Sequence, residues 1–339
     1  MLKVQGLRLR PGEPESKLTK KLQRELGCEV QGFQVLRRSV DARKKEDVSF
    51  VYTLGVDIPH ENQVLKKCRS KRVSLYTPPE YHFPARHLRL SQRPVIVGAG
   101  PAGLFCALML ARAGARPIVL ERGQDVDTRT ELVSSFWRGG ALDPECNVQF
   151  GEGGAGTFSD GKLHTGVNDP RMQQILREFV AFGAPSEILW DANPHVGTDY
   201  LKIVVKNIRL ELEKLGAEVR FSHQLTGILT ENGRVVGAEI RSPEGAYPLK
   251  TGHLVLAIGH SARDTFRMLY DSGVPMEQKQ FAMGVRIEQK QRDVTIAQYG
   301  EKIAGLPVAT YKLSCHPDTG RGAFSFCVCP GGLVVAAAS

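Results

Sequence analysis

The most constraining feature of this sequence is a run of about thirty residues that begins near position 93. Val95–Val97 is a short apolar stretch typical of a buried strand, and the glycine-rich turn Gly98–Gly103 follows it directly. An apolar helix is predicted over residues 104–113, and residues 117–120 predict a second strand that ends at Glu121. This order of strand, glycine turn, helix, strand and acid commits the region to a βαβ unit with a parallel sheet.

Each glycine of the turn has a mechanical role. Gly98 permits the tight turn, Gly100 lets the backbone approach a pyrophosphate, and Gly103 lets the helix pack against the strand. The helix N-terminus offers unpaired N–H groups and a favourable dipole to phosphates. Glu121, 18 residues after Gly103, is placed to accept hydrogen bonds from a ribose. The run therefore predicts a dinucleotide site. The turn alone does not separate FAD from NAD. Glu121 argues against NADP, because a carboxylate would repel a 2′-phosphate, although the neighbouring Arg122 weakens that argument.

Later segments narrow the choice of dinucleotide. A second glycine-rich loop runs over residues 149–163, where NAD dehydrogenases have no use for one. In flavin-binding oxidoreductases such a loop brings backbone N–H groups close to the pyrophosphate and the flavin ring. Residues 252–264 predict a buried strand that ends in Ala-Ile-Gly, and residues 217–240 predict a strand and a β-hairpin that turns at Asn232-Gly233. Both resemble segments that pass beside the dinucleotide in two-dinucleotide-binding flavoproteins.

Together these residues resemble the bacterial family of FAD-dependent dehydrogenases, also described as NAD(P)/FAD-dependent oxidoreductases, whose substrate is unassigned. The resemblance spans nearly the whole chain and is most specific at residues 37–45, 95–103, 150–163, 259–264 and 325–339. It implies an α/β fold, with an FAD-binding Rossmann-type core of the two-dinucleotide-binding flavoprotein kind and a small N-terminal αβ domain. Family members are substantially longer, so we expect a C-terminally truncated chain, which would hold FAD poorly.

The resemblance also implies the contacts of the cofactor. The FAD pyrophosphate would lie against the first glycine turn, the adenosine ribose at the acid, and the flavin nearer the second loop. The implied cofactor-binding residues are Gly98, Gly100, Ala102, Gly103, Glu121, Arg122, Gly154, Gly156, Lys162, Leu225 and Gly259. No metal is expected.

No catalytic constellation stands out, because a flavin performs the redox chemistry itself and the protein tunes it. Lys162 would place a cation near flavin N1, but it equally fits an exposed loop lysine. His164 and His260 would act as acid or base near neutral pH, or serve as hydrogen-bonded structural histidines. Ser261 or Asp264 would cap the helix that follows.

The cysteines exclude one class of chemistry. Flavin disulfide reductases carry a CxxxxC pair soon after the ribose acid, whereas only Cys146 occurs between Glu121 and Gly161. A dithiol relay is excluded there, and we expect Cys146 to be a packed thiol. The seven cysteines form no framework, which favours a cytoplasmic setting. No apolar run reaches the roughly 20 residues of a membrane span, so we expect no membrane contact.

The front of the chain differs in charge from the rest. Residues 1–93 hold 20 Lys and Arg against 10 Asp and Glu, while the remainder holds 25 against 26. Leucines four apart predict a helix over residues 16–26 with Ser16 as its N-cap, flanked by short strands. The basic surface would bind nucleic acid, or would be solvated or dock on the flavin domain or a substrate carboxylate. No aromatic residues interleave with the cations, so nucleic acid is the less favoured partner.

The length and the change in charge predict two domains. Residues 1–90 form the small basic αβ domain, and residues 91–339 form the FAD-binding domain with its C-terminal part missing. Substrate-side segments interrupt the second domain at about residues 127–200 and from about residue 275. The sequence does not indicate an oligomeric state.

These features predict an FAD-dependent oxidoreductase of the dehydrogenase type. It would transfer hydride between an unknown small-molecule substrate and flavin N5, with NAD(P)H as external electron donor. Two alternatives stay open. One is a flavin-dependent monooxygenase of the same fold. The other is a non-catalytic flavin-binding module, or an inactive fragment, that serves a nucleic acid or protein partner through residues 1–93.

Overall fold

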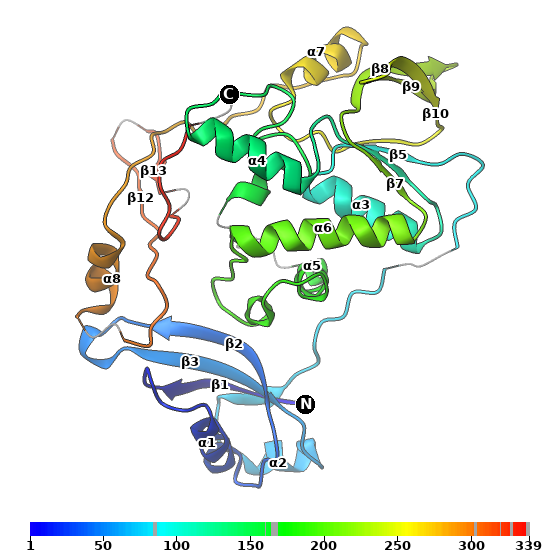
Figure 1. The fold of residues 1–339 in the computed structure, drawn as a ribbon. Coiled ribbons are helices and arrows are strands. Elements are labelled where there is room, and N and C mark those ends of the chain that lie inside the picture. Colours follow the sequence, from blue (N-terminus) through cyan, green and yellow to red (C-terminus); the bar gives the residue numbers. More distant parts are fainter. Residues whose placement is uncertain are drawn as a thin grey trace.

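The computed structural model describes residues 1–83, 87–159, 161–163, 169–301, 304–318, 320–325 and 328–336. A small N-terminal unit and a larger unit are joined by a connecting segment that leads from β4 to β5 (Figure 1). In the described part of the chain, none of the helices is long and apolar enough to cross a membrane.

The N-terminal unit is an antiparallel sheet of four strands with two helices packed on one face. Its elements are β1 (Leu2–Leu9), α1 (Ser16–Leu26), β2 (Gln34–Asp41), the 3₁₀ turn Lys45–Asp47, β3 (Ser49–Val56), α2 (Glu61–Lys67) and β4 (Val73–Leu75). The strand order is β2-β3-β1-β4, a βαββαβ arrangement. The predicted helix is confirmed, and Leu18, Leu22 and Leu26 are its buried face. The predicted cap is wrong, because Ser16 is already helical and Glu15 occupies the cap position without a side-chain bond.

The larger unit is built on a parallel sheet of short strands in the order β11-β5-β6-β7. These strands are β5 (Val95–Val97), β6 (Ile118–Leu120), β7 (Glu218–Arg220) and β11 (Leu254–Leu256), and α3 (Pro101–Arg112) connects β5 to β6. A second, antiparallel sheet contains β8 (Gln224–Glu231), β9 (Arg234–Ser242) and β10 (Gly245–Lys250). The predicted βαβ unit and the predicted hairpin are therefore both present.

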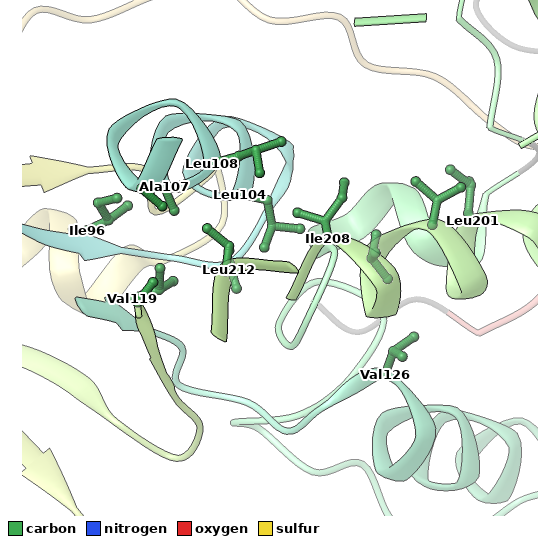
Figure 2. Packing of buried hydrophobic residues seen from close by; sticks show 14 of the residues in the cluster. Ile96, Leu104, Ala107, Leu108, Val119, Val126, Leu201, Ile208 and Leu212 are labelled. Carbon is green, nitrogen blue, oxygen red and sulfur yellow. The ribbon is translucent and has the colours of Figure 1, made fainter. Parts of the chain in front are cut away.

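Side chains alternate between the two faces of the parallel strands, and both faces are buried. Ile96 and Val119 point toward α3 and α6 (Thr198–Lys214), where they share a core with Leu104, Leu108 and Leu212 (Figure 2). The opposite face packs on the three-stranded sheet through Val95, Val97, Ile118, Leu120, Leu225, Ala238 and Ile240. With both faces covered, the carboxyl ends of the strands are the place for a binding site.

Further elements lie between β6 and α6 and after β11. They are α4 (Val126–Trp137), the 3₁₀ turns Gly154–Phe158 and Ser186–Leu189, α5 (Pro170–Ala181), α7 (Arg263–Asp271), α8 (Gln291–Tyr299), β12 (Ser314–Cys315) and β13 (Ala323–Phe324). Asp125 caps α4, since its carboxylate accepts hydrogen bonds from the N–H groups of Asp127 and Thr128.

The two units meet along the outer edge of β2. The N–H of Arg38 donates to the carbonyl of Trp190 at 2.8 Å, and the N–H of Ala192 donates to the carbonyl of Arg38 at 2.9 Å. The guanidinium of Arg38 pairs with Asp191 at 3.2 Å and lies 4.4 Å from the centre of the Trp190 ring. One basic residue of the front region thus fastens the N-terminal unit to the larger unit.

Candidate cofactor site

A cavity of about 570 Å³ opens at the carboxyl ends of β5, β6 and β11. Its walls come from the turn after β5, the end of β6, the glycine-rich loop 149–156, the start of β8, and the turn from β11 into α7. Segments more than 150 residues apart in the sequence therefore converge on one space.

Most of the predicted cofactor-binding residues line this cavity. Those that do are Gly98, Gly100, Ala102, Glu121, Arg122, Gly154, Gly156, Leu225 and Gly259, together with the candidate acid–base residue His260. Gly103 is not on the wall, because it is buried where α3 packs against the first turn. Lys162 is not on the wall either. Its backbone forms an isolated β-bridge with His195, and its position near flavin N1 stays a prediction. His164 lies outside the described residues.

The first glycine turn depends on backbone packing. Gly98 has a φ of +103°, and a Cβ there would overlap the carbonyl oxygen of Ala257 at the end of β11. A Cβ on Gly103 would overlap the carbonyl oxygen of Gly98. Gly100 is the N-cap of α3 and supplies no side-chain cap, so the N-terminal turn of the helix faces the cavity with its backbone. This is the geometry that phosphates require at a helix N-terminus.

Glu121 ties the two glycine-rich segments together. Its buried Oε2 accepts the N–H of Ala99 at 2.8 Å, and its Oε1 accepts the N–H groups of Gly123 and Gly151 at 2.9 Å each. A carboxylate offers about four lone-pair sites, so one site on Oε2 remains for a ribose hydroxyl. The predicted ribose ligand therefore also has a structural role that the sequence did not indicate.

Arg129 of α4 supports the second glycine-rich loop from the buried side of that loop. Its side chain is completely buried (0% exposed), and its guanidinium lies 4.8 Å from the centre of the Phe158 ring. The guanidinium donates to four backbone carbonyls at 2.6–3.3 Å, those of Asn147, Val148, Gly151 and Glu152. Burial lowers the pKa of Arg129 to about 10. Sequence reasoning missed this residue, although Val126, Arg129 and Val133 fall at the i, i+3, i+7 positions of a buried helical stripe.

Glu152 continues this buried network. Its Oε2 accepts the N–H of Val126 at 2.7 Å, and its Oε1 accepts Nε of Arg209 at 2.8 Å. Burial raises the pKa of Glu152, although both hydrogen bonds act in the opposite direction. The loop that forms one wall of the cavity is thus fixed to α4 and α6 by charged groups that solvent hardly reaches.

Arg122 lines the cavity next to Glu121, but its charge is already partnered. It donates two hydrogen bonds to Asp264 at 2.9 Å each and one to Glu145 at 2.7 Å. Burial opposes ionisation, but the hydrogen bonds to Glu145 and Asp264 outweigh it and raise the pKa of Arg122. Its guanidinium is therefore committed to two carboxylates and is not placed to attract a 2′-phosphate.

The predicted caps of the helix after β11 are wrong. Ala262 occupies the cap position of α7 and makes no side-chain bond. Asp264 instead holds Arg122 and accepts the side-chain amide of Gln224 at 2.6 Å. Ser261 contacts Nε2 of His260 at 3.1 Å. Asp264 also accepts the N–H of Thr265 at 2.9 Å, so its carboxylate links α7 to Arg122 and Gln224.

The cysteine prediction agrees with the structure. Cys146 is buried at 3% exposure, and burial raises the pKa of its thiol. Within the described residues, no group of three or more His, Cys, Asp or Glu side chains is arranged to hold a metal ion.

Residues 92–295 match the family described as pyridine nucleotide-disulphide oxidoreductase, which is more than half of the chain. The chain belongs to this family. Residues 280–339 match the FAD-dependent protein, C-terminal domain-like family, and residues 1–57 match a domain of unknown function. The predicted family, the α/β fold with its Rossmann-type core, and FAD as the cofactor are thereby confirmed.

Similar proteins give less detail about the reaction. A protein of Clostridium beijerinckii, described only as uncharacterized, is 45% identical over 329 residues, which cover 96% of this chain; the chain spans only 61% of that relative. The thiamine thiazole synthase of Aeropyrum pernix is 27% identical over 236 residues, covering 66% of this chain and 73% of that protein. The crystal structure of Thermovibrio ammonificans THI4 aligns at 19% identity with a TM-score of 0.37, covering 54% of this chain and 62% of that one.

Proposed function

We propose that this oxidoreductase transfers hydride between a small-molecule substrate and N5 of FAD, with NAD(P)H as external electron donor. The observation that carries the proposal is the single cavity at the ends of β5, β6 and β11. The glycine turn, the ribose acid and the β11 turn all line it. From the scattered cysteines we also propose a cytoplasmic setting.

The residues of this cavity fit an FAD molecule. Gly98 lets the turn pass tightly against Ala257, and a side chain larger than a methyl at Gly100 would extend into the space that a pyrophosphate needs. The N-terminal turn of α3 would hold the phosphates, and Oε2 of Glu121 would accept a ribose hydroxyl. Because Arg122 is neutralised by Asp264 and Glu145, the ribose end suits a dinucleotide without a 2′-phosphate. Bound FAD would supply the redox chemistry.

His260 is the best candidate for moving a proton to or from the substrate. It is exposed, it lines the cavity at the β11 turn, and Ser261 contacts its Nε2. An imidazole titrates near neutral pH and so suits this task. His223 also lines the cavity, but its Nδ1 lies 2.6 Å from the carbonyl oxygen of Phe221, an acceptor that orients the ring.

The visible spectrum of the purified, FAD-reconstituted chain tests the proposal. We expect flavin absorbance that bleaches when NADH or NADPH is added without oxygen. Gly100→Val should abolish FAD binding, because the valine side chain would enter the cavity. The chain should stay folded, because a Cβ at position 100 meets only the Cα of Gly154, at 3.8 Å. If Gly100→Val keeps its FAD, the pyrophosphate has been placed wrongly. NAD(P)H-dependent oxygen uptake tied to substrate hydroxylation would point to a monooxygenase instead.

A further inference from the structure

A second hollow, of about 610 Å³, lies in the N-terminal unit, away from the residues that line the cofactor cavity. β4 pairs only with Leu2–Val4, and the next residues of β1, Gly6–Arg8, line the hollow. Helix α1, the end of β2 with the loop that follows it, Val51 of β3 and the turn before β4 supply the remaining walls. Five separate segments therefore form a concave surface that the proposed reaction does not use.

The hollow is strongly basic. Its cations are Arg8, Lys21, Arg24, Arg43 and Arg72. Its carboxylates are those of Glu25 and Asp41 only. Five cations against two carboxylates leave a net charge of +3 on the lining, and this hollow accounts for part of the basicity that distinguishes the front of the chain.

Two of the cations already have partners, which fix the shape of one wall. Arg43 donates two hydrogen bonds to Asp41 at 2.7 and 2.9 Å, and Arg8 pairs with the same carboxylate. These hydrogen bonds, chiefly those from Arg43, hold the pKa of Asp41 well below its usual range. Arg8 also lies 3.9 Å from Asp47. This wall is therefore close to neutral.

The opposite wall carries the uncompensated charge. Lys21 donates to the carbonyl of Arg8, and the carboxylate of Glu25 accepts the hydroxyl of Ser70. Across the ranges that the structure describes, Arg24 and Arg72 have no acidic partner, and both are exposed. Lys21, Arg24 and Arg72 thus face the hollow with one carboxylate beside them, that of Glu25, and this wall keeps a net charge of +2.

We propose that this hollow binds a ligand through a chain of phosphate groups. Arginine forks match phosphate oxygens in pairs, and three cations around one space suit a ligand with several adjacent negative charges. None of the lining residues, all of which lie in the described part of the chain, is aromatic. The hollow therefore offers charge and no stacking platform for a base, which favours a polyphosphate tail as the recognised group.

Calorimetric titration of the full chain with sodium tripolyphosphate at constant ionic strength tests the proposal. We expect saturable binding that weakens about tenfold or more in the double variant Arg24→Gln/Arg72→Gln. The matched control is Lys66→Gln/Lys67→Gln on α2, which removes the same charge outside the hollow and should leave the affinity unchanged. All four side chains are on the surface, so both variants should fold, and circular dichroism together with FAD content verifies this.

A second titration, with a labelled 12-residue uridine oligonucleotide, identifies the source of the phosphates. If the oligonucleotide binds more tightly than tripolyphosphate and only the Arg24→Gln/Arg72→Gln variant loses it, the hollow is supported and its phosphates come from a nucleic acid. If both variants weaken equally with either probe, the attraction is a diffuse property of the basic surface and the proposal fails. Absence of binding by both probes overturns it as well. None of these outcomes depends on flavin reduction.

Discussion

The two glycine-rich segments of the cofactor cavity are built in different ways. The first, Gly98–Gly103, is held by its own backbone, because Gly98 and Gly103 allow strand, turn and helix to touch directly. The second, Gly151–Gly156, is held by buried side chains from elsewhere, chiefly Arg129 of α4. Glu121 joins the two through Ala99 and Gly151. The glycines of both segments could be predicted from the sequence, whereas the distant charged side chains that hold the second segment could not.

The largest expected effect is at the first segment. Gly103→Val would place a side chain into the carbonyl oxygen of Gly98, and backbone cannot move aside without separating α3 from β5. We expect a loss of more than about 4 kcal/mol in the free energy of unfolding, measured by urea denaturation, or no folded protein at all. Gly156→Ala is the control, since a Cβ there meets no atom within 4 Å, and it should change stability by less than about 0.5 kcal/mol. Equal stability of the two variants would contradict the packing described here.

The next largest effect is at the support of the second segment. Arg129→Met would keep much of the side-chain volume but leave four buried carbonyls without their donor. We expect a loss of about 3 kcal/mol and weaker FAD retention. Arg138→Met, at the exposed end of the same helix, should change neither quantity. If the two variants behave alike, Arg129 does not support the loop.

A pH series tests whether ionisation of the buried Glu152 carboxylate, in the second segment, lowers the stability of the folded chain. The raised pKa of Glu152 means that the folded chain binds its proton more tightly than the unfolded chain does. Its contribution to stability is therefore complete below the ordinary value of 4.5 and is lost as the pH rises through the raised pKa. Wild type should lose Tm relative to Glu152→Gln between pH 4 and pH 7. If the Tm difference between the two proteins stays constant over this range, or shifts in favour of wild type, the pKa of Glu152 is not raised in the folded chain.

The smallest effect concerns the start of the helix that carries Arg129. Asp125→Ala removes the cap that accepts the N–H groups of Asp127 and Thr128, at a cost of about 1 kcal/mol. Asp125→Asn keeps an acceptor and should retain most of that stability, so the urea midpoints of the three proteins should follow the order wild type, Asn, Ala. A midpoint for the alanine variant equal to that of wild type would show that α4 does not need this cap.

Prediction from sequence succeeded where periodicity and glycine chemistry act locally. The strand Val95–Val97, the helix over residues 16–26 and the hairpin at Asn232-Gly233 were all anticipated. α2, β4 and β10 were missed. Glu61–Lys67 is largely polar, β4 is only three residues long, and Pro248 interrupts the strand pattern of Gly245–Lys250. Their stability comes from pairing and packing with partners elsewhere in the chain.

The site shows the same division. Positions contributed by backbone, such as Gly98, Gly100 and Gly259, line the cavity as expected. Positions whose role depends on where a side chain reaches were harder to predict, and Asp264 holds Arg122 where a helix cap was expected. A charged side chain several ångströms long has many partners within reach, and only the tertiary structure selects one.

The contact between Arg38 and residues 190–192 affects how the N-terminal unit would behave as a separate fragment. An edge strand with unpaired backbone groups is a template for another chain, and here the segment from Trp190 to Ala192 pairs with β2 at its middle, at Arg38. A fragment that ends in the connecting segment before β5 would lose this pairing and expose the backbone groups of Arg38 as well. Such a fragment should self-associate through β2, so the N-terminal unit is best produced with a charged substitution on that edge or together with its covering segment.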